Sequence, residues 1–258
     1  MNRKDAPFIC VRDLSVAYDD KTIVHDVNFT VNHGDIFVIM GMSGCGKSTI
    51  MRSMIGLLPP SNGQIIIDGT DMWAADDGVR NNIISGFGVS YQSGALFSSM
   101  TVWENVALPL QLKTNMNAYT INKRVHEKLH MVGLDDADDL YPSEISGGMV
   151  KRVAIARAMA LNPRILFFDE PSAGLDPVRS ADLDKIILDI NRRTGATIVM
   201  VTHDLSSIMN IATNAVYIDI NTKSVGACGA PRDILRTTKN REIKKFLKPN
   251  GGKNETTK

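Results

Sequence analysis

The stretch GMSGCGKST, residues 41–49, constrains the fold of this chain more than any other feature. It fits the pattern G-x-x-x-x-G-K-[ST], in which backbone N–H groups of a glycine-rich turn surround nucleotide phosphates, the lysine reaches the terminal phosphates and a hydroxyl holds Mg²⁺. The pattern is informative only between a strand and a helix, and here the apolar run Ile36–Met40 precedes it and a helical stretch, 48–58, follows it. The sequence therefore predicts a phosphate-binding loop made of Gly41, Met42, Ser43, Gly44, Cys45, Gly46, Lys47, Ser48 and Thr49.

The composition is that of an ordinary globular protein. With 43% hydrophobic residues, 22% charged residues and a net charge of +1, the 258-residue chain has no global charge that would attract it to nucleic acid. No apolar run approaches the roughly 18 residues that span a bilayer, and the first residues lack the apolar region of a signal peptide. Three scattered cysteines are typical of reduced thiols. We therefore expect a cytosolic protein that does not bind nucleic acid.

Hydrophobic patterning divides the chain into three kinds of structure. Short alternating runs at 8–11, 22–24, 27–31 and 65–67 predict an antiparallel β layer, and helical spacing from 103 to 161 predicts an inserted helical subdomain. Continuous apolar runs at 165–168 and 198–201, with a helix at 182–193 between them, predict parallel strands that are covered on both faces.

Together these elements predict an α/β P-loop NTPase fold, with a RecA-like parallel sheet, an N-terminal antiparallel β layer and a helical subdomain at about 93–162. We expect one domain, 8–245, with 215–220 as its last strand. The polar segment 246–258 is expected to be a disordered tail.

Polar residues follow each apolar strand at its carboxyl end, where open α/β sheets bind ligands. Asp169 is the expected second ligand of Mg²⁺, although a carboxylate at a strand end is often only a turn or cap residue. Glu170 could orient or deprotonate the attacking water, and its alternative is a solvated surface glutamate. His203 follows the strand at 198–201, and a lone histidine is more often structural.

The segment YPSEISGGMVKRVAIARAMALNPRILFFDEPSAGLDP, residues 141–177, resembles the region from the signature motif to the Walker B motif of ABC transporter ATPases. The resemblance extends over most of the chain, and it implies Mg²⁺-dependent ATP hydrolysis by a head-to-tail pair of copies. It also implies residue roles: adenine stacks on Tyr18, Gln92 reaches Mg²⁺ and the water, Ser146, Gly147 and Gly148 form the signature that covers ATP bound to the other copy, Asp176 belongs to the D-loop, and His203 contacts the γ-phosphate.

The signature has two physical interpretations from the residues alone. Ser146 and the glycines open a helix that begins near Met149, so hydroxyl, bare N–H groups and helix dipole could all face a phosphate. Alternatively, Ser146 only caps the helix. Met149 stands where the family usually has glutamine, and it cannot make the hydrogen bonds of an amide.

Met149 and the stretch YQSGALFSSMTVWENVALPL, residues 91–110, resemble the ATPase subunits of Mla-type phospholipid transporters. That resemblance implies a multispanning inner-membrane permease, an MCE-domain lipid-binding protein and a small STAS-domain protein as partners. It places the chain on the cytoplasmic face of the inner membrane, held there through its permease. The segment 92–105 is the expected docking groove, through Leu96, Phe97, Met100 and Trp103, unless these four side chains fill the core of the helical subdomain.

We therefore predict the ATP-hydrolysing subunit of a complex that moves phospholipid between the inner and outer membranes and maintains lipid asymmetry. The alternatives are an ABC importer or exporter ATPase for another solute, and a soluble ABC-type ATPase acting on DNA or ribosomes. The last would be expected to show tandem cassettes, a long coiled-coil insertion or a basic patch, and the sequence displays none of them.

Overall fold

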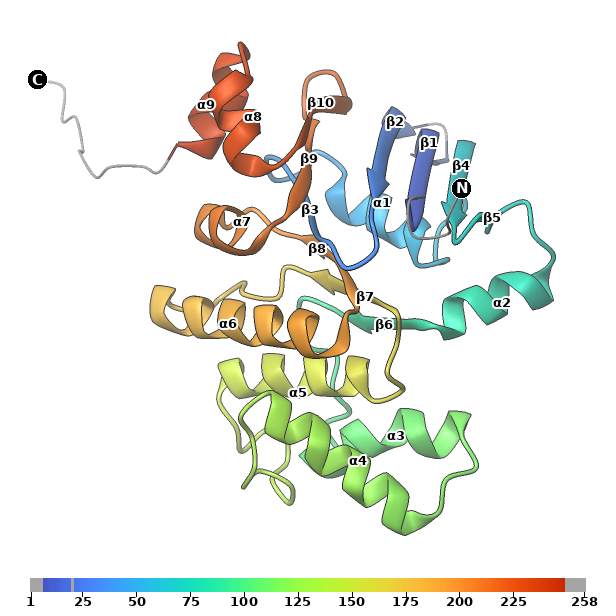
Figure 1. Cartoon of the computed structure of the whole chain (residues 1–258), viewed down its shortest axis with the longest axis vertical. Coiled ribbons are helices and arrows are strands. Elements are labelled where there is room, and N and C mark those ends of the chain that lie inside the picture. The colour runs from blue at the N-terminus through green and yellow to red at the C-terminus, as the bar shows by residue number, and fades with distance from the viewer. Residues whose placement is uncertain (1–6, 20, 249–258) are drawn as a thin grey trace, which may run out of the picture.

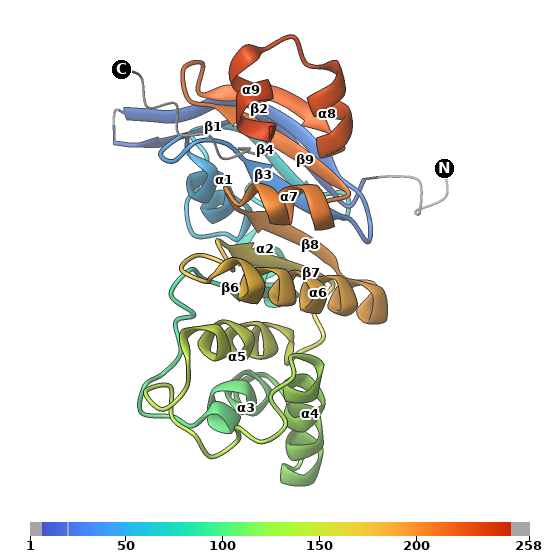
Figure 2. The same ribbon diagram turned by 90° about the vertical axis from the view of Figure 1, so that its left-hand side faces the viewer.

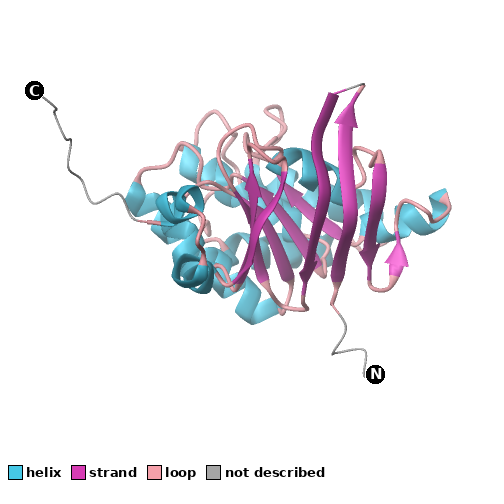
Figure 3. Ribbon diagram, turned by 90° about the horizontal axis from the view of Figure 1, so that it is seen from above, coloured by secondary structure: helices cyan, strands magenta, loops and turns pink. Residues whose placement is uncertain are grey.

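The computed structural model describes residues 7–19 and 21–248, and its strands form two sheets. The antiparallel sheet has the order β2-β1-β4-β5, with β1 Ile9–Tyr18, β2 Lys21–Val31, β4 Asn62–Ile67 and β5 Thr70–Asp71. The larger sheet has the order β10-β9-β3-β8-β7-β6, with β3 Ile36–Met40, β6 Phe87–Ser90, β7 Ile165–Asp169, β8 Thr197–Val201, β9 Asn214–Asp219 and β10 Ser224–Gly229. Only β10 in this sheet is paired antiparallel to its neighbour. Seen from above, the strands gather together and most helices lie to one side (Figure 3).

Strand β3 shows why the parallel strands have unbroken apolar sequences. All five of its residues are buried, but alternate side chains enter different cores. Ile36 and Val38 pack with the helices on one face, and Phe37 and Ile39 pack with the antiparallel sheet and helix α1 (Lys47–Met54) on the other. A strand covered on both faces needs apolar residues at every position.

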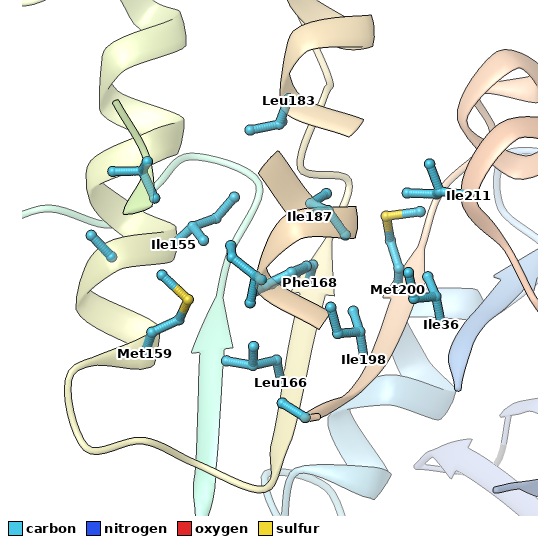
Figure 4. Close-up of a cluster of buried hydrophobic side chains, with 14 of the residues drawn as sticks. Ile36, Ile155, Met159, Leu166, Phe168, Leu183, Ile187, Ile198, Met200 and Ile211 are labelled. Atoms are coloured by element: carbon cyan, nitrogen blue, oxygen red, sulfur yellow. The ribbon is translucent and has the colours of Figure 1, made fainter. Parts of the chain in front are cut away.

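The core on the helical face joins the parallel sheet to the helices. Figure 4 shows Leu166 and Phe168 of β7 beside Ile155 and Met159 of α5 (Gly147–Met159), with Ile187 of α6 (Pro177–Thr194) against the same sheet. The other helices of the structure are α2 Asp77–Ser85, α3 Val102–Lys113, α4 Ala118–Met131, α7 Leu205–Ile211, α8 Pro231–Thr237 and α9 Arg241–Leu247.

Helices α3, α4 and α5 lie between β6 and β7 in the chain and together at one end of the molecule (Figures 1 and 2). Helix α3 starts with a capping box, in which Thr101 and Glu104 satisfy each other's backbone N–H groups. Helix α5 lies very close to β6, since a Cβ on Gly88 would come within 2.1 Å of the carbonyl oxygen of Ala158. Position 88 therefore accepts only a residue without a side chain.

Several elements differ from the sequence-based expectation. Strands β1 and β2 are continuous and 10 and 11 residues long, because bulges in their pairing carry the strands through positions where the alternation breaks. The sequence pattern missed β6 and β10, which contain glycines and few apolar residues. Helix α6 begins at Pro177 rather than at 182, since its first turn is exposed and lacks apolar spacing.

The C-terminal boundary predicted at residue 245 is wrong. Helix α9 continues to Leu247, which is buried, and Phe246 stacks edge-on against Tyr217 with ring centroids 5.3 Å apart. The short spacing of Ile243 and Leu247 on one helical face is hidden among lysines in the sequence. The rest of the predicted tail, 249–258, lies outside the described residues. In the described part of the chain, no helix combines the length and the apolar character that a membrane span needs.

Candidate functional site

The carboxyl ends of β3, β7 and β8 meet at one cavity of about 440 Å³. Residues from each of the three segments that follow these strands line it, together with residues from two further segments. The lining consists of Ser43, Gly44, Gly46, Lys47, Ser48 and Thr49 from the phosphate loop, together with Ile23, Gln92, Glu170 and His203. Gly41, Met42 and Cys45 of the predicted loop lie outside this lining, and the Cys45 side chain is buried instead.

The phosphate loop is held in shape by glycine and by its lysine. Gly46 precedes α1 with φ of 102°, and a Cβ there would come within 2.5 Å of the Val24 side chain. Lys47 is 7% exposed, and its Nζ donates to the carbonyl oxygens of Gly41 and Met42, each at 3.0 Å. The ammonium group is thus fixed beside the turn whose N–H groups the pattern assigns to phosphate.

A hydroxyl and a carboxylate lie together at the start of α1. The Oγ of Ser48 donates to Oδ1 of Asp169 at 3.1 Å. The pKa of Asp169 is raised above its ordinary value, mainly by burial. The charge of Glu170 adds to this rise, and the hydrogen bond from Ser48 opposes it. Among the described residues no group of three or more His, Cys, Asp or Glu side chains could hold a metal ion. The pair nevertheless fits Mg²⁺, which commonly takes one or two protein oxygens and completes its shell with water and substrate phosphates.

Glu170 and His203 form a contact that the sequence could only suggest. Oε1 of Glu170 lies 2.8 Å from Nδ1 of His203. Since an ionised carboxylate only accepts, Nδ1 carries the hydrogen in this pair. Glu170 has a left-handed backbone with φ of 47°, held by its N–H donating to the carbonyl of Val201 at 2.8 Å. Such strain in a residue other than glycine is frequent at functional sites.

Gln92 lines this cavity and an adjoining one of about 560 Å³ that also contains Asp169 and Arg52. Tyr18 lies outside the lining of both, and its hydroxyl accepts a hydrogen bond from Arg52 at 3.0 Å. Sequence reasoning overlooked Arg52 and Ile23. Arg52 could have been found, because it follows Ser48 by four residues and so shares its face of α1.

Two of the three signature residues, Ser146 and Gly148, lie at a different cavity of about 140 Å³, whose lining also has Met149, Arg152, Leu175, Arg179 and Leu183. Gly147 lies outside this lining. In the described part of the chain this lining shares no residue with the phosphate-loop cavity. Ser146 caps α5, because its Oγ accepts a hydrogen bond from the N–H of Met149 at 3.3 Å. For this oxygen atom, the capping interpretation is therefore correct. The hydroxyl hydrogen and the start of a 13-residue helix are still available to an anion.

Asp176 of the predicted D-loop is the cap of α6. Its side chain accepts from the N–H groups of Val178 and Arg179, both at 3.0 Å. The backbone hydrogen bond from Arg179 is the main reason that the pKa of Asp176 is lowered. Capping therefore accounts for an aspartate at this position by itself.

Comparison with known proteins identifies the family. The sequence pattern of a family described as ABC transporter matches residues 24–173. The chain belongs to the ABC transporter family.

The relatives of this ABC protein include two of different description. It is 41% identical over 237 residues to the probable ribonucleotide transport ATP-binding protein mkl of Mycobacterium tuberculosis. The matched region covers 92% of this chain but only 65% of that protein. It is 36% identical over 247 residues to the intermembrane phospholipid transport system ATP-binding protein MlaF of Escherichia coli, with 96% of this chain and 91% of that protein covered.

Solved structures share the ABC fold. The protein cbiO1 of Clostridium perfringens, part of the ABC transporter complex cbiONQ, superposes with a TM-score of 0.82 at 27% identity, over 90% of this chain and 91% of that chain. The ATP-binding cassette MJ0796, a dimer bound to ADP and Pi in a post-hydrolysis state, has a TM-score of 0.77 at 29% identity, over 86% and 98% of the two chains. The predicted α/β P-loop fold with an antiparallel layer is confirmed, and the chain is an ABC ATPase domain.

The ABC domain also has an apolar surface groove of about 400 Å³ beside the Gln92 loop. Phe97, 51% exposed, lines it with side chains of α3 such as Leu108 and Leu112. Of the four predicted docking residues, only Phe97 is in the lining. Leu96 and Trp103 pack against the buried core, as the alternative interpretation required, and the lining does not include Met100.

One further cavity, of about 430 Å³, lies between α4, α5 and α6 and contains none of the predicted site residues. Its basic side chains already have partners, since Lys128 pairs with Glu127 at 2.9 Å and Arg193 with Asp189 at 2.8 Å. These pairs give the cavity a structural explanation.

Proposed function

We propose that this chain is the ATP-hydrolysing subunit of an ABC transporter that moves phospholipid between the inner and outer membranes and so maintains lipid asymmetry. The observation that carries the proposal is the similarity to MlaF, which extends over 96% of this chain and 91% of that protein. Similarity over nearly the whole of both chains supports a shared architecture around the ABC domain, including the segments that face other subunits.

The phosphate-loop cavity supports the chemistry. In this proposal the N–H groups of residues 43–49 and the ammonium of Lys47 bind the phosphates, and Ser48, Asp169 and Gln92 hold Mg²⁺. Bound Mg²⁺ neutralises phosphate charge as it develops. Glu170 orients the attacking water and accepts its proton, while the ring of His203, held by Glu170, lies against the γ-phosphate.

Two copies are required because the signature residues line a separate cavity from the phosphate loop. In a head-to-tail pair, Ser146, Gly147 and Gly148 of one copy would cover the phosphates on the other. ATP then favours closure by binding both copies only when they are closed, and hydrolysis removes that bias. The dimeric cassette MJ0796 is a precedent for two copies in this family.

The proposed partners follow from the same similarity. The groove beside Phe97 would receive a cytoplasmic segment of a multispanning inner-membrane permease, which holds the chain at the cytoplasmic face of that membrane. An MCE-domain lipid-binding protein and a small STAS-domain protein complete the proposed complex. A nucleic-acid partner has no support from the net charge of +1.

A second candidate is transport of another solute by the same mechanism. It is favoured by the 41% identity to mkl, which is described as a probable ribonucleotide transport protein. The chain spans only 65% of mkl, so that protein has segments without a counterpart here.

The two candidates differ in what the assembled complex carries. We would purify the complex from membranes through a tag on this chain, identify its subunits and extract bound lipid. The complex would then be reconstituted in vesicles with labelled phospholipid. ATP-dependent phospholipid movement that is lost with Glu170→Gln supports the proposal. A complex that hydrolyses ATP but moves a nucleotide and no phospholipid would exclude it.

A further inference from the structure

Side chains of α5, the helix that begins with the signature, donate hydrogen bonds to the loop that carries Gln92. The guanidinium of Arg157 donates from Nη1 to the carbonyl of Ala95 at 2.8 Å and from Nη2 to the carbonyl of Gly94 at 3.0 Å. The ammonium of Lys151 donates to the carbonyl of Gln92 itself. Two basic side chains of one helix thus hold three carbonyls within four residues of loop.

The loop conformation explains why such contacts are needed. Gly94 and Ala95 both have left-handed backbones, with φ of 77° and 48°. For alanine this conformation is unfavourable because its Cβ crowds the following carbonyl oxygen, whereas hydrogen bonds from charged donors are stronger than those between neutral groups. The hydrogen bonds from α5 therefore oppose the strain and hold the loop in this conformation. The loop also packs directly on α5, since a Cβ on Gly94 would lie 2.8 Å from the Val150 side chain.

The charge of Lys151 is also influenced by a residue of the candidate site. Burial lowers the pKa of its ammonium, and the negative charge of Glu170 opposes that change. The same side chain therefore links α5 electrostatically to the carboxylate beside His203.

Arg157 extends the connection to the groove. Its guanidinium lies over the ring of Phe97, 6.0 Å from the centroid, and it lines the groove with that ring. Ser146 caps the first turn of the same helix. Over 13 residues the helix is a rigid rod of about 20 Å, so these contacts are attached to one body.

We propose that Lys151 and Arg157 are positioning residues that clamp the Gln92 loop to α5. Gln92, the signature and the groove then move as a unit. The consequence of this clamp rests on the proposed function. When a permease segment moves in the groove, Gln92 is repositioned at the bound ATP and Ser146 at the ATP of the other copy in one step. Without the clamp, the groove could move while Gln92 stays behind.

The first test is a double-mutant cycle on ATP hydrolysis by the intact membrane complex. Lys151→Met should lower kcat about 10-fold, as expected for a misplaced group, with little change in KM for ATP. In a Gln92→Ala background the same substitution should have almost no further effect, because Lys151 acts through that loop. Lys151→Arg, which keeps the donor and the charge, should restore most of kcat.

Matched controls separate the clamp from a general loss of charge. Lys123→Met removes an exposed lysine on α4 and should leave kcat unchanged. A Lys151→Met effect that simply adds to that of Gln92→Ala, or no effect on kcat at all, would overturn the role in catalysis that we propose.

The second test measures the loop itself by amide hydrogen exchange and needs neither lipid nor turnover. Lys151→Met and Arg157→Met should each raise exchange at residues 92–97 at least several-fold, while exchange in the centre of β3 stays at the wild-type rate. Unchanged exchange at 92–97 in both variants would refute the clamp, whatever the complex transports. If exchange rises as expected but the wild-type complex moves no phospholipid, the clamp stands and the proposed substrate is wrong.

Discussion

The phosphate-loop cavity and the signature cavity use their polar side chains in different ways. Around the phosphate loop, side chains from distant parts of the chain pair with one another, as in Ser48 with Asp169 and Glu170 with His203. Around the signature, Ser146 and Asp176 cap the helices that they begin. The first cavity holds paired acidic, basic and hydroxyl groups, and the second holds two helix starts and the side chains of Arg152 and Arg179.

In the proposed function, this difference means that one chain would carry a nearly complete reaction centre and an incomplete cover. The cover is a surface with helix dipoles and donors but no reactive side chain, so its use depends on another molecule bringing a phosphate to it. Each half can therefore be damaged without the other, and the following experiments exploit that.

The largest effect should come from Glu170→Gln. Losing the proton acceptor should reduce hydrolysis by about 10²–10⁴-fold, since that is the range for a positioned general base. ATP-dependent association of two copies should persist, because the signature cavity is untouched. Phosphate release and size-exclusion chromatography with ATP measure the two properties separately. Near-normal hydrolysis would remove Glu170 from its proposed role.

Lys47→Ala should weaken ATP binding itself. Removal of a charged donor from the phosphates should cost about 1.5–3 kcal/mol, or roughly 10–150-fold in Kd. Fluorescent-nucleotide titration measures it, and Lys21→Ala, an exposed lysine before the loop, is the control. Unaltered affinity in the Lys47 variant would mean that the loop does not bind phosphates as proposed.

Mixing two variants, at an ATP concentration too low for Lys47→Ala to bind, tests whether the cover acts on another copy. Gly148→Asp places a carboxylate in the first turn of α5, where it suits the helix and repels a phosphate, and the space there allows a side chain. In a mixture with Lys47→Ala, each mixed pair has one intact composite site, so roughly a quarter of wild-type activity should return. Steady-state hydrolysis across mixing ratios measures it. No recovery at any ratio would indicate that the signature serves its own chain.

The smallest effect is expected at Asp184, where α6 meets α7, and it concerns the free energy of unfolding rather than ATP hydrolysis. Burial raises the pKa of Asp184 to about 6, a hydrogen bond from Ser207 lowers it, and the charge of Asp204 raises it. When folding raises the pKa of a carboxyl group, the free energy of unfolding of the protein falls as the pH rises from about 4 through 6. The reason is that the carboxyl ionises less readily in the folded state than in the unfolded state. Asp184→Asn should therefore raise the free energy of unfolding by about 1–3 kcal/mol at pH 8 and by little at pH 4.

Denaturant unfolding at both pH values checks this expectation. The wild-type protein is the reference, and its free energy of unfolding should fall more than that of the variant between pH 4 and pH 8. An equal change at pH 4 and pH 8 would contradict the raised pKa.

Much of the placement of the candidate site could be predicted, because its residues follow strands with strong apolar patterns. The runs before Gly41, Asp169 and Thr202 fixed which polar residues share an edge of the sheet, and the structure brings Lys47, Glu170 and His203 to one cavity. The order of the strands could not be inferred, since β6 joins the sheet through the weak pattern Phe-Gly-Val-Ser. The sequence also could not show which of the predicted groove residues are exposed. Phe97 and Trp103 are both aromatic, but in the structure Phe97 is exposed and Trp103 packs against the core.

Contacts made by long basic side chains were the least predictable. Nothing in the sequence marks Arg157 rather than Arg152 as the residue that reaches the Gln92 loop, because both lie on α5 among alanines and valines. Such side chains reach several ångströms in many directions, and their partners are backbone carbonyls, which every residue has. Only the fold decides which carbonyls are presented.

The contact between Gly88 and Ala158 has a consequence for engineering. A chimera that exchanges α3–α5 with those of a relative would naturally be cut at the polar loops near 93 and 162. Those junctions leave one half of the contact in the recipient and the other in the graft, although a side chain at 88 would collide with the backbone at 158. Grafts whose upstream junction falls before Phe87 should fold more often than shorter ones, because strand and helix are then inherited together.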